Sequence, residues 1–75
     1  MVSGVVAGIK KIITEKGLKQ GYVAHKADFD IYQFSNLLHG KRVLRAEDLP
    51  RIANALGVSI ADIYEAGKEN QKEGE

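Results

Sequence analysis

One segment of the sequence carries side chains that could read the edges of DNA bases. An α-helix turns by about 100° per residue, so a helix over residues 30–39 would place Tyr32, Ser35, Asn36 and His39 on one polar surface. An asparagine amide can bridge adenine, a serine hydroxyl can meet any base, and an isoleucine such as Ile31 can contact a thymine methyl group. The candidate base-reading residues are Ile31, Tyr32, Gln33, Ser35 and Asn36.

The positions around this segment also favour a helix with one side in a core. Asp30 is a good N-cap, and Gln33 three residues later completes a capping-box pattern. Phe29 before the cap and Phe34 at the fourth helical position form a hydrophobic staple. The leucines at positions 37 and 38 lie within about 60° of Phe34 and define the core face.

Cationic residues flank this helix on both sides. The N-terminus of a second helix, beginning at Gln20, would present free amides and a positive dipole end, which suits a phosphate. Phosphate contacts orient a protein on DNA, whereas base contacts specify the site. The candidate phosphate-contacting residues are Lys19, Gln20, Lys26, His39, Lys41, Arg42 and Arg45. The competing interpretation is an ordinary solvated helix face with no ligand.

Net charge alone is uninformative at +1, but its distribution is uneven. Residues 1–45 contain eight Lys or Arg against three acidic residues, which gives +5. Residues 46–75 contain three against seven, which gives −4. This asymmetry indicates that one part of the molecule meets a polyanion.

Other functional chemistry has little support in the sequence. Cysteine is absent, which excludes disulfides, cysteine-rich zinc sites and thiol nucleophiles. His25 and His39 lack partners at metal-ligand spacing, and no paired carboxylates, catalytic triad or phosphate loop is visible. We therefore expect no catalytic, cofactor-binding or metal-binding residue, no enzyme activity and no small-molecule ligand.

The chain also shows no sign of membrane insertion or export. No segment approaches the roughly 20 apolar residues of a membrane helix, and the uncharged stretch from Met1 to Ile9 has no signal-peptide pattern. We expect a cytoplasmic protein with no membrane partner.

The fold class follows from helical spacing and from glycines. Glycines at positions 17, 40, 57 and 67 each follow a segment with apolar residues at helical spacing, and glycine commonly ends a helix. No segment alternates as a half-buried strand does. We predict an all-α fold of five helices, with Ser3 a possible N-cap of the first. The expected helices cover residues 3–16 or 4–16, 20–27, 30–39, 48–56 and 59–67.

This pattern resembles the Cro/CI-type (XRE family) helix-turn-helix of phage repressors and small bacterial regulators. The resemblance covers about Ile9 to Tyr64 and is carried by EKGLKQGYVAHKA, FDIYQFSNLLHGKR and DLPRIANALGVSIADIY. The sequence departs from the family pattern at Lys19, Gly21, Asp28 and His39. Asp28 stands where glycine is usual, at a turn position that needs a left-handed residue.

The resemblance implies a compact, lambda-repressor-like DNA-binding domain over residues 1–67. The polar composition of residues 68–75 predicts a mobile tail after it. It implies a transcriptional regulator that inserts the helix over residues 30–39 into the major groove of a double-stranded operator. Such modules usually form homodimers on palindromic sites with half-sites about 34 Å apart. We expect dimerisation through the last helix, and repression by promoter occlusion, because the 75 residues hold no activation domain.

Two other classes of function stay open. The helix-turn-helix domain could serve mainly as a protein-interaction module, such as an antitoxin that binds a toxin through its tail or last helix. It could also be an accessory domain of an enzyme, although the basic half argues against that. Ile60 and Tyr64 fit either a small core or an exposed dimer patch.

Overall fold

A computed structural model describes residues 4–73 of the chain, with side chains up to Lys68. Five helices make up the described part: α1 (Gly4–Lys16), α2 (Gln20–Lys26), α3 (Ile31–Leu38), α4 (Asp48–Leu56) and α5 (Ile60–Glu73). No strand occurs within residues 4–73. The predicted all-α class and the five helices are confirmed, and Ser3 lies outside the described residues.

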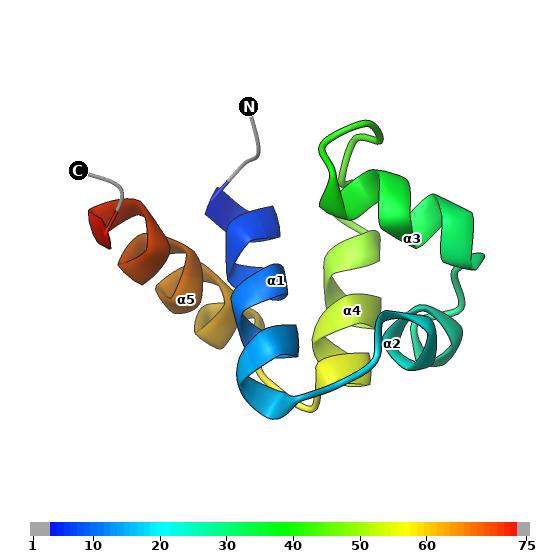
Figure 1. Ribbon diagram of the computed structural model, residues 1–75, viewed down its shortest axis with the longest axis horizontal. Coiled ribbons are helices and arrows are strands. Elements are labelled where there is room, and N and C mark those ends of the chain that lie inside the picture. Colours follow the sequence, from blue (N-terminus) through cyan, green and yellow to red (C-terminus); the bar gives the residue numbers. More distant parts are fainter. Residues whose placement is uncertain (1–3, 74–75) are drawn as a thin grey trace.

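The helices are arranged so that α1 and α5 lie side by side, while α2 and α3 lie on the other side of α4 (Figure 1). One core joins all five helices, since each contributes at least one side chain that is fully shielded from solvent. These side chains are Ile9, Val23, Phe34, Leu37, Ile52 and Ile63. The helix-turn-helix unit, α2 and α3, is therefore held by contacts with the rest of the domain.

Most of the predicted helix ends are confirmed. Gly17, Gly40 and Gly57 have φ values of +66°, +75° and +72°, in the left-handed region where glycine ends a helix without a steric cost. Ser59 caps α5, because its Oγ accepts a hydrogen bond from the Asp62 amide at 3.0 Å and Asp62 Oδ2 accepts one from the Ser59 amide at 3.1 Å. The second helix ends one residue earlier than expected, at Lys26.

The prediction that Gly67 ends the last helix is wrong. Helix α5 continues through this residue to Glu73, so part of the expected tail is helical. Gly67 is buried against α1, where a Cβ atom would meet the carbonyl oxygen of Gly4 and lie 2.8 Å from its carbon. A Cβ at Gly8 would likewise meet the Ile63 carbonyl oxygen and lie 2.9 Å from the Gly67 nitrogen. These glycines let two helix backbones approach closely.

Candidate nucleic-acid interface

Helix α3 divides into an apolar and a polar side as the helical spacing predicts. Phe34, Leu37 and Leu38 are buried. On the other side, Tyr32 is 77% exposed, and Asn36 is exposed one turn further along. The structure thus leaves an aromatic side chain with a hydroxyl and an amide side chain in solvent on the same helix face, where both can donate and accept hydrogen bonds.

The start of α3 is fixed by the predicted capping box. Asp30 Oδ1 accepts a hydrogen bond from the Tyr32 amide at 2.8 Å, and the Asp30 amide donates to Gln33 Oε1 at 3.2 Å. The staple is also present, since the rings of Phe29 and Phe34 are 5.8 Å apart between centroids. The Gln33 side chain therefore takes part in the cap. This candidate base-reading residue also stabilises the start of α3.

The remaining candidates on α3 differ in their exposure. Ile31 is 43% exposed beside the start of the helix. Ser35 is half-buried, and its carbonyl oxygen is 2.7 Å from Nδ1 of His39. Because a carbonyl can only accept a hydrogen bond, Nδ1 of His39 carries the proton of this contact. The His39 ring is thereby held at the C-terminal end of α3, and the histidine is exposed.

The start of α2 offers backbone amides without a side-chain acceptor. Lys19 occupies the N-cap position with φ −83° and ψ +139°, and its side chain makes no capping hydrogen bond. Gln20 follows as the first helical residue and is half-buried. The first amides of a helix have no partner within the helix. An anionic oxygen would satisfy them, as the sequence analysis anticipated.

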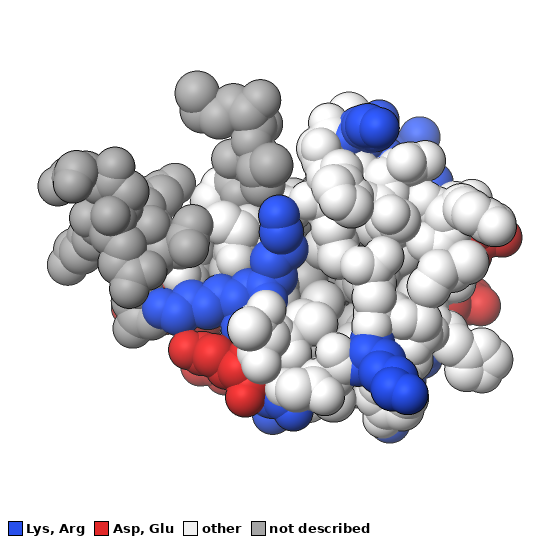
Figure 2. All heavy atoms as spheres, viewed as in Figure 1, with Lys and Arg blue, Asp and Glu red and all other residues white. Residues whose placement is uncertain are grey.

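The cations around α3 differ in what they contact. Lys41 and Lys26 are exposed, and Lys26 Nζ donates to the Tyr22 hydroxyl at 3.3 Å. Arg45 is exposed, and its Nη1 lies 3.9 Å from a carboxylate oxygen of Glu47. Lys and Arg atoms gather at the loop that follows α3, at the top of Figure 2, whereas α3 itself shows mainly uncharged atoms in this view.

Arg42 is less available for a phosphate than its place in the sequence indicates. Its guanidinium carbon lies 5.6 Å from the centroid of the Phe29 ring, and the residue is half-buried. Its Nε is buried and has no hydrogen-bond partner. The side chain therefore packs on the core with part of the guanidinium, and only its outer nitrogens can face a ligand.

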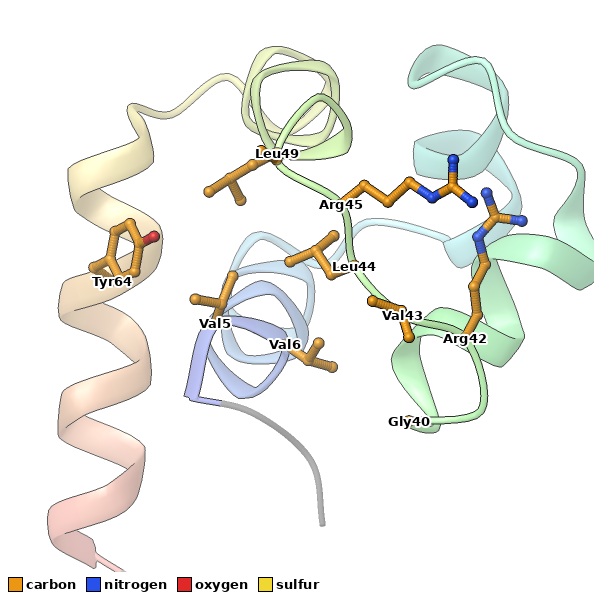
Figure 3. A pocket seen from close by; sticks show the side chains of 10 residues that line it. Val5, Val6, Gly40, Arg42, Val43, Leu44, Arg45, Leu49 and Tyr64 are labelled. Atoms are coloured by element: carbon orange, nitrogen blue, oxygen red, sulfur yellow. The ribbon is translucent and has the colours of Figure 1, made fainter.

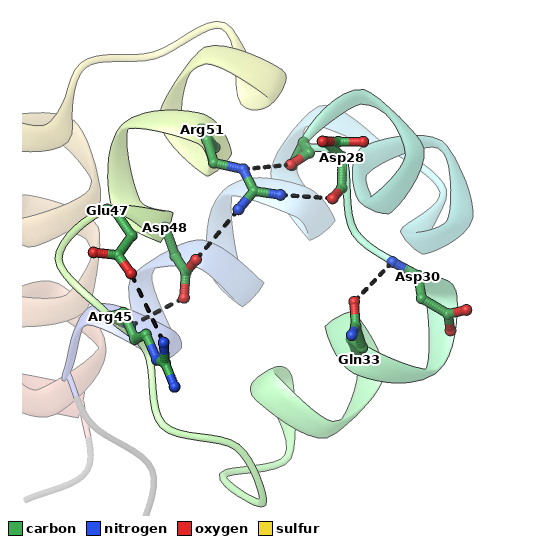
Figure 4. A network of polar contacts seen from close by, with 8 residues as sticks. Asp28, Asp30, Gln33, Arg45, Glu47, Asp48 and Arg51 are labelled. Carbon is green, nitrogen blue, oxygen red and sulfur yellow. Dashed lines mark hydrogen bonds and ion pairs between the residues drawn. The ribbon is translucent and has the colours of Figure 1, made fainter.

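Arg51 connects α4 to the turn between α2 and α3, a role that the sequence pattern did not reveal. Its Nε donates to the Ala27 carbonyl at 3.0 Å and its Nη2 donates to the Asp28 carbonyl at 2.6 Å (Figure 4). These partners lie more than 20 positions away in the sequence, so helical spacing could not reveal them. The only local signal was Asp48, one turn earlier on α4, which pairs with Arg51 at 3.5 Å.

An apolar groove of about 440 Å³ lies between the start of α1, the loop after α3, the start of α4 and α5 (Figure 3). Val5, Leu44, Leu49 and Tyr64 line it together with Arg42 and Arg45 of the loop, whose guanidinium groups point away from it (Figure 3). Tyr64 is 49% exposed and Ile60, on the same helix, is 37% exposed. The two residues left ambiguous by the sequence are thus solvent-accessible on α5.

The described residues were also compared with the requirements of metal sites and membrane-spanning helices. They contain no cluster of three or more His, Cys, Asp or Glu side chains placed to hold a metal ion. None of the described helices is long and apolar enough to cross a membrane.

Known proteins share both the sequence pattern and the fold. The sequence model of the Cro/C1-type helix-turn-helix DNA-binding domain matches residues 8–69. A tyrosine-to-phenylalanine variant of the restriction-modification controller protein C.Esp1396I is 30% identical, with a TM-score of 0.86 over 99% of this chain and 94% of that chain. The wild-type controller protein is 32% identical, with a TM-score of 0.82 over 91% of this chain and 90% of that chain.

A more distant structure shows the same fold. The clp gene regulator ClgR from C. glutamicum has a TM-score of 0.82 at 22% identity, over 91% of this chain and 88% of that chain. No curated protein matches the chain in sequence.

Proposed function

The chain belongs to the Cro/C1-type helix-turn-helix DNA-binding domains, and from this premise we propose that it is a sequence-specific repressor that inserts α3 into the major groove of duplex DNA. The observation that carries this proposal is the exposed polar face of α3. Tyr32 and Asn36 lie on it in solvent, while Phe34 and Leu37 anchor the opposite side in the core. A helix held in this way can present a rigid edge to the bases.

In the proposed complex, one group of residues contacts base edges and another contacts phosphates. Ile31, Tyr32, Ser35 and Asn36 would meet base edges, with Gln33 placed beside them by the capping box. The flanking groups would meet phosphates: Lys19, Gln20, Lys26, His39, Lys41, Arg42 and Arg45. Arg42 would contribute only through its outer nitrogens, because its Nε is buried. Occupying a promoter in this way would block transcription.

We propose further that two copies act together on a palindromic operator. A single recognition helix reads only a short half-site, and paired modules of this kind read half-sites about 34 Å apart. Tyr64 of α5, which lines the groove and is exposed, and the exposed Ile60 one turn earlier on the same helix support a contact between copies. Helix α5 lies away from α3 (Figure 1), so a contact there leaves the recognition surface open.

A selection from random duplex DNA at two salt concentrations tests the function. We expect enrichment of one palindromic sequence, two chains per duplex and weaker binding at the higher salt concentration. The double variant Tyr32→Ala/Asn36→Ala should lose the enrichment. The control Lys68→Ala, which changes an exposed residue of α5 that pairs with Glu65 at 3.7 Å, should keep it. Absence of any enriched sequence with the unaltered protein would refute specific DNA binding.

A further inference from the structure

Arg51 holds the turn of the helix-turn-helix from outside the motif. Its side chain starts on α4 and donates hydrogen bonds to two successive carbonyls, Ala27 at 3.0 Å and Asp28 at 2.6 Å. The planar guanidinium presents its N–H groups in a fixed fork. Two carbonyls bound by one fork cannot rotate independently, so the backbone between α2 and α3 is held in one orientation.

The turn that Arg51 holds is conformationally demanding. Asp28 has a φ of +64° and is the only non-glycine residue with a positive φ in the described part of the chain. This left-handed conformation is costly for residues with a Cβ, although aspartate tolerates it better than most. A contact that specifically binds the carbonyls of residues 27 and 28 therefore stabilises a turn that the sequence alone leaves strained.

The same guanidinium is fixed in place by its other neighbours. Its carbon lies 4.4 Å from the centroid of the Phe29 ring, which packs on Phe34 of α3 at 5.8 Å. Its Nη1 is 3.5 Å from Oδ1 of Asp48, a residue only 2% exposed. The other oxygen of Asp48 accepts a hydrogen bond from the Arg45 amide at 3.1 Å. Arg51 is thus tied to the start of α4 through Asp48 (Figure 4), and to α3 through Phe29.

From these contacts we propose that Arg51 is a positioning residue that sets the orientation of α3 relative to α2, and thereby the sequence specificity of DNA binding. The proposal rests on the proposed function, since it names what controls the accuracy of the same site. Base contacts need close geometry, whereas phosphate contacts of flexible lysines tolerate displacement. Loosening the turn therefore reduces specific binding while leaving non-specific binding intact.

The test compares specific and non-specific affinity in the full chain. Arg51→Lys keeps the positive charge but cannot bind both carbonyls as a fork does. We expect about a tenfold loss of affinity for the selected duplex, comparable to one mismatched base pair, with non-specific affinity and salt dependence unchanged. The control Lys68→Arg exchanges the same two side-chain types at an exposed position of α5 outside the proposed DNA contacts, and should leave both affinities unchanged.

A second variant links the effect to the turn. Glycine adopts a φ of +64° without strain, so Asp28→Gly added to Arg51→Lys should restore part of the lost specific affinity. All affinities are measured at a temperature at which circular dichroism shows each variant fully folded. A merely structural role for Arg51 would then leave both affinities unchanged, and a direct phosphate contact would lower both together.

The outcomes separate this proposal from the one on which it depends. Unaltered protein with no preferred duplex refutes the proposed function. A preferred duplex whose advantage over random DNA is the same for Arg51→Lys refutes the positioning role alone. A loss that Asp28→Gly fails to restore refutes the assignment of that role to the turn.

Discussion

We expect Asn36 to contribute most directly to the recognition of DNA sequence. It is exposed on the face of α3 that also carries Tyr32, and an amide can bind adenine through two hydrogen bonds. We predict that Asn36→Ala lowers discrimination by about 1–3 kcal/mol at one or two base positions. Affinities for a set of single-base variants of the selected duplex measure this change. Unaltered discrimination would show that α3 does not lie in the groove as proposed.

Lys41 is a better probe of phosphate contacts than Arg42. Lys41 is exposed in the loop after α3, whereas Arg42 is half-buried and packs on Phe29. We predict that Lys41→Ala weakens binding to all sequences similarly and reduces the slope of log affinity against log salt by about one unit. Titrations at several salt concentrations measure the slope, with Lys68→Ala as the control. An unchanged slope would place Lys41 away from the phosphates.

Sequence reasoning identified the local features of the candidate site and missed the long-range ones. The Asp30–Gln33 capping box and the Phe29–Phe34 staple each depend on residues three to five positions apart, so their pattern was readable. The contacts of Arg51 and the packing of Arg42 on Phe29 depend on how α4 and its preceding loop fold back. Helical periodicity contains no information on such contacts.

At the level of elements, the pairing of α1 with α5 explains why Gly67 was wrongly predicted to end the last helix. A glycine after an apolar segment gives the same sequence signal whether it ends a helix or allows two helices to touch. Gly40 and Gly57 end helices with positive φ values, whereas Gly67 lies inside α5 against the backbone of Gly4. Only the packing of α1 on α5 distinguishes the two uses.

This helix pair yields a prediction on stability. Gly8→Ala should destabilise the domain by on the order of 1–2 kcal/mol, because the new methyl group overlaps the Ile63 carbonyl and overpacking outweighs the helix propensity of alanine. Chemical denaturation measures the difference. Gly21→Ala is the matched control within α2: its Cβ would lie 3.3 Å from only the flexible Cδ1 of Ile31. It should be neutral or stabilising by up to about 1 kcal/mol. Equal effects of the two substitutions would contradict close packing of α1 on α5.

For the whole molecule, charge is distributed unevenly along the chain. The first 45 residues carry +5, and the remaining 30 carry −4. The basic residues of the first part include those around α2 and the loop after α3, whereas α5 carries Asp62 and Glu65. In the proposed complex, this charge distribution would orient the domain towards the phosphates and leave α5 for the proposed contact with another copy.

The association of two copies through α5 is open to a direct test. Tyr64 is 49% exposed beside the apolar groove, so Tyr64→Glu should leave the fold intact and place a charge in the proposed contact. We predict that it weakens dimerisation by about tenfold or more, and that it weakens operator binding more at low protein concentration, where monomers predominate. Sedimentation and titration of the operator measure both effects.

Glu65→Gln provides the control for this substitution. It changes the neighbouring exposed residue on α5 without adding charge, and it should leave dimerisation within about twofold of the unaltered protein, as expected for most surface substitutions. A Tyr64→Glu variant that still dimerises normally would exclude the groove and Tyr64 from the contact. An unaltered protein that is monomeric at high micromolar concentration and binds operator as one chain per duplex would exclude the dimer itself.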